Sequence, residues 1–286
     1  MCLAHGDKDP RVQVKFMDLT MLAVEYGTSM SEIPKEHPDA KKFSSDRPFL
    51  SETFDLVICD GQILRTHFRE EYRQNREVLR LNVAQLILGM TRIKPGGTFV
   101  MLLHKADAFD NIELLQTFDK ISKIKLFKPR TAHAPRSSFY LIARDVNPSH
   151  DIAQEAMQQW KDDWKKETLA GDQGTGLSKE IPTEAKVKAV MEEFGPKLIT
   201  LAKEIWLVQK NALARASYTK PNSPRIPTGT DPRAMYPKPG AGSANLEGRW
   251  KGSYPKVDSA STTLESAKTA PASPNKGHEW QNPWRK

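Results

Sequence analysis

Polar side chains end three apolar runs in the first half of the chain. Asp18 ends the first run, Asp60 the second, and His104 and Lys105 the third. In an open α/β sheet, ligands bind beyond the carboxyl ends of the strands, so these residues are the first candidates for chemistry. A carboxylate at such an edge can accept a hydrogen bond from an adenine amino group or orient a nucleophilic hydroxyl. For Asp60 alone, which is followed by Gly61, an ordinary turn is an equally good interpretation.

The elements that must position these residues alternate between strands and helices. Apolar–polar alternation and short apolar runs predict strands, and apolar residues at helical spacing predict helices. The predicted strands are 12–18, 54–61, 98–103, 123–127 and 139–143, the predicted helices are 69–92 and 108–118, and residues 27–53 form a polar loop. Such alternation predicts right-handed crossovers and a largely parallel sheet that is covered on both faces.

The sequence Lys94-Pro95-Gly96-Gly97 separates the helix predicted over 69–92 from the strand that follows it. Glycine after a helix is foremost a C-cap. We therefore interpret the Gly-Gly pair as the end of the helix and a tight entry into the strand, and we do not assign it to a cofactor.

Two more helices are predicted beyond Pro148, over 151–170 and 183–216, the second of them interrupted at Gly195-Pro196. Three tryptophans occupy apolar positions of these helices, with the spacing of residues that pack in a core. They are Trp160, Trp164 and Trp206. We expect them to pack rather than to bind a ligand.

The composition changes again near residue 218. From there to residue 286 the chain is rich in Pro, Gly, Ser and Lys and poor in aliphatic residues, so it cannot bury enough apolar surface to offset its ordering entropy. The sequence therefore predicts three parts: an α/β domain over 1–147, a helical extension over 148–217 and a disordered basic tail over 218–286.

The net charge of +8 is concentrated in that tail. Residues 218–286 contain eleven Lys or Arg and five Asp or Glu, which leaves a net charge of about +2 for the rest of the chain. A disordered basic tail can hold RNA through phosphate contacts, and such tails also serve solubility alone. Both interpretations stay open at this point.

Cysteine and histidine usage indicates neither a disulfide framework nor a metal site. Cys2 and Cys59 are the only cysteines, and His5, His67 and His133 are isolated in predicted loops with no partner at ligand spacing. We expect an intracellular, reducing compartment, either cytoplasm or nucleus. The longest apolar runs are far shorter than the ~20 residues of a membrane span, so no membrane association is predicted.

Four segments in succession resemble the FtsJ-like RNA 2'-O-methyltransferases, the family of the RrmJ type. They are "FDLVICDGQ", "IKPGGTFVMLLHK", "KIKLFKP" and "RSSFYLIARD", with a long helix between the first two. The resemblance covers roughly residues 10–146. It implies a Rossmann-like, S-adenosylmethionine-dependent methyltransferase domain over 1–147 that acts on a ribose 2'-hydroxyl of RNA.

The resemblance also implies roles for single residues. Family members are thought to use a Lys-Asp-Lys-Glu set to align the ribose hydroxyl with the methyl group and to remove its proton. Asp60 matches the aspartate of this set. Asp18, with Leu19 beside it, matches the position that usually contacts the adenine of the methyl donor, and Asp60 borders the same ligand.

The other members of the catalytic set are displaced or absent. The second lysine of the family falls on Leu102, and Lys105 is a possible substitute three residues later, although side chains 102 and 105 point to opposite faces of a regular strand. The glutamate falls on Ser138, two residues before Tyr140. The first lysine and the Gly-rich donor loop have no counterpart in this sequence.

The family's strand order is 3-2-1-4-5-7-6, and the predicted strands correspond to the third through the seventh. Without the first two, the strand ending at Asp18 loses the neighbours that connect it to the strand ending at Asp60, at a cost comparable with the ~5–15 kcal/mol that stabilises a domain. Either these two strands pair directly, or a partner fills the gap, or the reading frame begins upstream of Met1. We expect the last, an N-terminally truncated domain.

Two functions follow from these patterns. The first is a methyltransferase of the FtsJ type that uses S-adenosylmethionine and methylates RNA at ribose 2'-O. The alternative is a catalytically degenerate methyltransferase fold that binds RNA or protein, because Leu102 and Ser138 replace catalytic side chains. A different acceptor is also open, since a fold does not fix its substrate. The sequence does not fix the oligomeric state.

Overall fold

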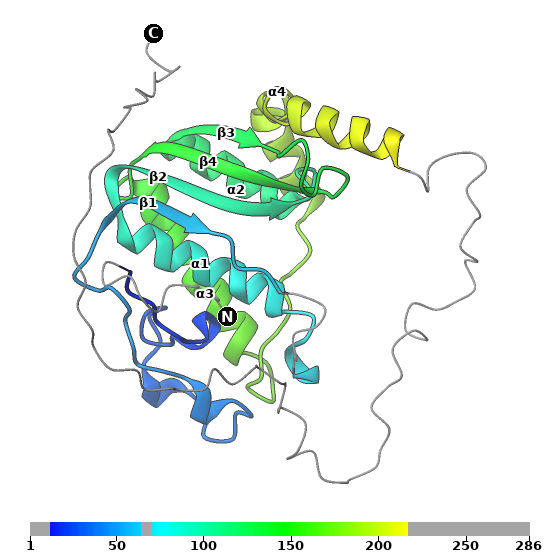
Figure 1. Cartoon of the computed structure of the whole chain (residues 1–286). Coiled ribbons are helices and arrows are strands. Elements are labelled where there is room, and N and C mark those ends of the chain that lie inside the picture. Colours follow the sequence, from blue (N-terminus) through cyan, green and yellow to red (C-terminus); the bar gives the residue numbers. More distant parts are fainter. Residues whose placement is uncertain (1–11, 64–69, 217–286) are drawn as a thin grey trace, which may run out of the picture. The chain divides into compact units, whose positions relative to one another are not determined.

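The computed structural model describes residues 12–63 and 70–216 (Figure 1). All of the described residues belong to one compact unit. The predicted tail over 218–286 therefore lies outside the described residues, as do Cys2, His5 and His67.

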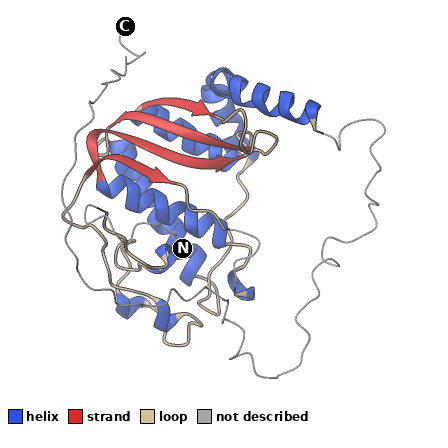
Figure 2. Cartoon of the chain, in the orientation of Figure 1, coloured by secondary structure: helices blue, strands red, loops and turns tan. Residues whose placement is uncertain are grey.

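A four-stranded sheet forms the centre of the fold (Figure 2). Its strands are β1 (Phe54–Cys59), β2 (Ile93–His104), β3 (Lys123–Phe127) and β4 (Ser138–Val146), in the spatial order β1-β2-β4-β3. Only β1 and β2 are parallel, because β4 runs antiparallel to both β2 and β3. The prediction of a largely parallel sheet was wrong. A parallel β3–β4 pair would need a crossover, and the segment between these strands contains no helix.

Helices cover one face of this sheet. They are α1 (Glu77–Arg92), α2 (Phe109–Ile121), α3 (Asp151–Leu169) and α4 (Glu184–Arg215). All four bury apolar side chains in one core with the sheet residues Phe99, Met101 and Leu141. On the opposite face Leu56 and Ile58 are more than half exposed, so the prediction of helices on both faces does not hold for the described residues.

The strand predicted over 12–18 does not form. Residues 12–18 have no regular structure, and Phe16 is 70% exposed. A strand needs a neighbour to pair its backbone groups, and the alternation of side chains alone does not supply one. Asp18 instead begins a 3-10 turn, η1 (Leu19–Met21), and the nearest ladder contact is an isolated bridge between Leu22 and Ser44. Direct pairing of this segment with β1 is thereby excluded.

The Lys-Pro-Gly-Gly sequence lies inside a strand, which corrects the prediction of a helix C-cap. Helix α1 ends at Arg92 and β2 begins at Ile93, so Gly96 and Gly97 fall within β2 at an irregularity in its pairing. Gly96 has a φ of +80°, and a Cβ on Gly97 would lie 2.8 Å from the Ile93 side chain. The glycines are therefore required by the backbone of the strand and not by the end of the helix.

Helix α4 is continuous through Pro196, so the predicted interruption at Gly195-Pro196 was wrong. Proline removes one backbone hydrogen bond, but the residues around it are held by the core. Phe194, Leu198 and Ile205 of α4 are all buried in the cluster formed with the sheet. Burial of this apolar stripe keeps the helix intact across the proline.

A second apolar cluster fixes the N-terminal segment to the helices. Met21, Tyr26 and Phe43 pack there with Val83 of α1 and Trp164 of α3. The segment over 27–53 contains only two 3-10 turns, η2 (Met30–Glu32) and η3 (Ala40–Lys42), in agreement with the predicted loop. The packing role predicted for the tryptophan at 164 is confirmed, since its side chain is fully buried.

Buried Glu167, near the end of α3, gives the protein a testable pH dependence. It is 2% exposed, and burial raises the pKa of its carboxyl above the ordinary value. The stabilisation from its bound proton is present below the unfolded pKa of about 4.3 and is lost as the pH rises through the folded value. We expect Glu167→Gln to stabilise the fold at pH 7 by about 1 kcal/mol, and to make no difference near pH 4.

Urea unfolding at pH 4 and pH 7 measures this effect. Glu155→Gln, an exposed position on the same helix, is the matched control and should change stability at neither pH. A Glu167→Gln protein that is less stable than wild type at pH 7 contradicts the expectation.

Candidate functional site

The parallel pair β1–β2 brings Asp60, His104 and Lys105 to one edge of the sheet. Cys59 pairs with Met101, so both strands point their carboxyl ends toward the same side. All three side chains are exposed there. The prediction that polar strand ends lie at a common edge of the sheet therefore holds for β1 and β2.

Glutamine side chains fix the turn after β1. Gln85 of α1 accepts a hydrogen bond from Gly61 N at 2.7 Å and donates one to Gly61 O at 3.2 Å. Gln62 Oε1 lies 3.0 Å from His104 Nε2, which connects the turn to the end of β2. These contacts hold the turn that follows Asp60 while its carboxylate stays exposed.

Tyr140 of β4 lies close enough to Asp60 to respond to its charge. Burial raises the pKa of the Tyr140 hydroxyl, and the negative charge of Asp60 raises it further. Tyr140 pairs with Leu102 across the sheet, on the face that no described helix covers. The tyrosine therefore remains a neutral hydrogen-bond donor beside the carboxylate at neutral pH. Tyr140 was not among the predicted site residues. It lies two residues after Ser138, so both side chains are on the same face of the strand, and this spacing could have identified it.

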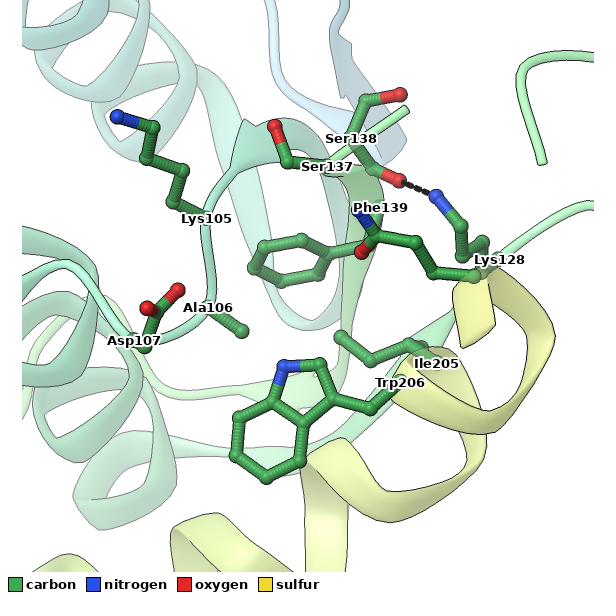
Figure 3. Close-up of a pocket in the computed structure, with 10 residues that line it drawn as sticks. Lys105, Ala106, Asp107, Lys128, Ser137, Ser138, Phe139, Ile205 and Trp206 are labelled. Atoms are coloured by element: carbon green, nitrogen blue, oxygen red, sulfur yellow. Dashed lines mark hydrogen bonds between the residues drawn. The ribbon is translucent and has the colours of Figure 1, made fainter. Parts of the chain in front are cut away.

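Lys105 lies on the other side of this edge. Its backbone has a φ of +60°, which is rare for a residue with a side chain. Two hydrogen bonds hold this conformation: Lys105 N donates to Ser137 O at 3.1 Å, and Asn111 Nδ2 donates to Lys105 O at 2.9 Å. Its side chain lines a cavity of about 310 Å³ beside Asp107 and Lys128 (Figure 3). Asp60 does not line this cavity, so the two predicted catalytic residues lie at one edge of the sheet but only Lys105 borders the cavity.

Asp18 and Leu19 have local partners in this structure. The Asp18 carboxylate accepts hydrogen bonds from Thr20 N at 2.9 Å and Thr20 Oγ1 at 2.8 Å, as the N-cap of η1. The Leu19 carbonyl accepts a bond from the Tyr26 hydroxyl. Neither Asp18 nor Asp60 lines the cavity of about 310 Å³ beside Lys105 or the cavity of about 290 Å³ between α1, α2 and α3.

Positive charge surrounds the end of β2. Burial lowers the pKa of His104, and the charges of Lys128 and Arg136 lower it further. His104 is thus a neutral imidazole at neutral pH. In the described part of the chain, His, Cys, Asp and Glu side chains form no group of three that could hold a metal ion.

The sheet order and the carboxylate after β1 define the chain as a mixed α/β protein with part of a Rossmann-like methyltransferase fold. Residues 5–146 match the FtsJ-like methyltransferases, and through this region the chain belongs to that family, whose members are transferases. Among curated proteins no match is found. Over the described ranges 12–63 and 70–216, no helix has both the length and the hydropathy to cross a membrane.

Proposed function

We propose that this chain is an S-adenosylmethionine-dependent methyltransferase of the FtsJ type that methylates RNA at a ribose 2'-hydroxyl. The observation that carries the proposal is the exposed carboxylate of Asp60 at the carboxyl edge of β1, within the matched family region and near enough to Tyr140 for its charge to raise the pKa of that hydroxyl. A carboxylate there can accept the hydrogen bond of a ribose hydroxyl and orient its oxygen. The methyl donor and the ribose acceptor are proposed on the strength of family membership.

The residues described supply the acceptor side of such a site. Asp60 would align the hydroxyl and accept its proton, and Tyr140 would donate a hydrogen bond to the same sugar. Lys105 would lend positive charge from the end of β2. The donor itself would supply the electrophilic methyl group. Asp18 and Leu19 remain the proposed contacts of its adenine, although in this structure both are engaged in η1.

Methyl transfer from tritiated S-adenosylmethionine to cellular RNA tests the proposal. After digestion to nucleosides, we expect the label in 2'-O-methyl nucleosides. Label on a base would keep the methyltransferase and overturn the ribose acceptor. Label on protein but not on RNA would overturn the RNA substrate.

A second candidate is a catalytically degenerate fold that binds RNA or protein. The arrangement of β2 and β4 favours it, because Leu102 and Ser138 stand where the family has its second lysine and its glutamate. Leu102 pairs with Tyr140, which does not replace the positive charge of the lysine. Ser138 pairs with His104, which does not replace the negative charge of the glutamate. Calorimetry separates the two functions. Micromolar binding of S-adenosylmethionine supports the enzyme, whereas salt-sensitive RNA binding without donor binding supports the degenerate module.

We also propose an intracellular, reducing compartment for this protein. Cys59, the one cysteine among the described residues, is buried against Gln85 O, and burial raises the pKa of its thiol to about 12. Such a thiol is unreactive and forms no disulfide in the fold.

A further inference from the structure

A buried lysine without an acidic partner lies beside the candidate site. Lys128 follows β3 and is only 5% exposed. Its ammonium group donates to Arg136 O and Ser138 O, both at 2.5 Å, and it forms no ion pair with any described residue. Two carbonyls satisfy two of its three donors, and its charge remains uncompensated. Burying a cation in this way is costly unless an anion joins it.

The cavity that Lys128 lines has the polar groups to receive an anion. Figure 3 shows Lys105 on one side and Lys128 on the other, with Ser137 and Ser138 between them. The hydroxyls and the two ammonium groups are donors that suit phosphate oxygens. Asp107 also lines the cavity, so its wall contains two lysines and one carboxylate.

Helix α4 supplies the opposite wall. Ile205, Trp206 and Gln209 close the cavity from that side, and its volume of about 310 Å³ is at the lower end of the ~300–1,000 Å³ range of small-molecule sites. Such a space accepts one phosphate together with part of its sugar or base. The Trp206 ring gives that sugar or base an aromatic surface.

We infer that this cavity binds a backbone phosphate of RNA through Lys128, Lys105, Ser137 and Ser138. The choice of RNA as the molecule that carries the phosphate rests on the proposed function. The cavity adjoins the edge that bears Asp60, because Ser138 pairs with His104 and His104 contacts Gln62. A phosphate held here would fix the register of the acceptor strand relative to Asp60.

RNA binding by the full chain, measured through the anisotropy of a labelled single-stranded oligoribonucleotide at several salt concentrations, tests the inference. Lys105 is exposed, so Lys105→Ala should fold normally. We expect it to weaken binding about three- to tenfold and to reduce the slope of log affinity against log salt by about one. Lys125→Ala, an exposed lysine of β3 outside the cavity, is the matched control and should change affinity less than about twofold.

Two further variants probe the buried part of the site. Lys128→Met should weaken RNA binding more than Lys105→Ala does. Ser137→Ala removes a half-buried hydroxyl and is used if the Lys128 variant fails to fold; a loss of about threefold is expected. Inorganic phosphate, added at constant ionic strength, should displace RNA from wild type more effectively than chloride.

Several outcomes overturn the inference. Equal losses in Lys125→Ala and Lys105→Ala would show diffuse attraction and no defined site. Phosphate binding without RNA binding would overturn the assignment to RNA. If Lys105→Ala lowers turnover but leaves RNA affinity unchanged, Lys105 belongs to the transfer step and not to a phosphate site. Because RNA affinity and its salt dependence are measured without turnover, a chain that proves inactive as a methyltransferase still tests the inference.

Discussion

Replacing Asp60 with asparagine should lower methyl transfer by about 10²–10⁴-fold, the range that a positioned acid–base group contributes. Asparagine keeps the shape of the side chain but cannot accept a proton from the ribose hydroxyl. Asp60 is exposed, and the turn after it is held by Gln85 contacts with Gly61, so the fold should be unaffected. Single-turnover transfer to RNA and urea unfolding measure the two effects.

A spectroscopic readout makes this prediction independent of activity. The charge of Asp60 raises the pKa of Tyr140, so Asp60→Asn should lower that pKa while the larger contribution from burial remains. NMR titration of labelled tyrosine measures the shift. Asp172→Asn, in the exposed loop after α3, should change neither turnover nor the tyrosine pKa. Undiminished turnover in Asp60→Asn would remove Asp60 from the mechanism.

Local apolar patterns were sufficient to predict most elements of the sheet layer. The predicted strands over 54–61, 98–103, 123–127 and 139–143 lie at β1, β2, β3 and β4. Each is a short, mostly apolar run, and that signal is independent of the partner strand. The segment over 12–18 shows the limit of such patterns, since alternation predicts which face is apolar but not whether a neighbouring strand exists.

Pairing and burial over long sequence distances were not predictable in the same way. β4 lies between β2 and β3 because the connection from β3 to β4 is short and contains no helix, and because of how the strands pack. This position of β4 brings Tyr140 within range of the Asp60 charge. Lys128 follows an ordinary strand in the sequence and would be expected in solvent. It is buried where its ammonium group donates to the carbonyls of Arg136 and Ser138, and these contacts form only in the folded chain, so the candidate phosphate site could not be found before the fold was known.

The N-terminal segment depends on one tryptophan for its attachment to the helices. The Trp164 ring packs against Tyr26 at 5.0 Å and Phe43 at 6.2 Å between ring centroids, and its indole Nε1 donates to Thr20 O at 3.0 Å. The side chain is 0% exposed. Trp164→Ala should therefore destabilise the protein by about 3–5 kcal/mol, the usual cost of truncating a buried aromatic residue.

That loss is a large part of the ~5–15 kcal/mol that stabilises a typical domain, so it should also release the segment locally. We expect limited proteolysis of Trp164→Ala to cleave within residues 19–44 before the sheet layer is attacked, because β1 to β4 belong to the other apolar cluster. Urea unfolding followed by circular dichroism measures the global effect.

Trp164→Phe is the control that separates the ring from its hydrogen bond. It keeps an aromatic ring between Tyr26 and Phe43 and loses only the indole N–H. Thr20 O still accepts a bond from Arg80 Nη2 at 3.2 Å, so the loss should be limited to about 1–2 kcal/mol. If Trp164→Ala is no less stable than Trp164→Phe, packing of the ring does not hold the N-terminal segment to the helices. The segment is then held by the buried hydrogen bonds of Arg80 with Thr20 and Thr168.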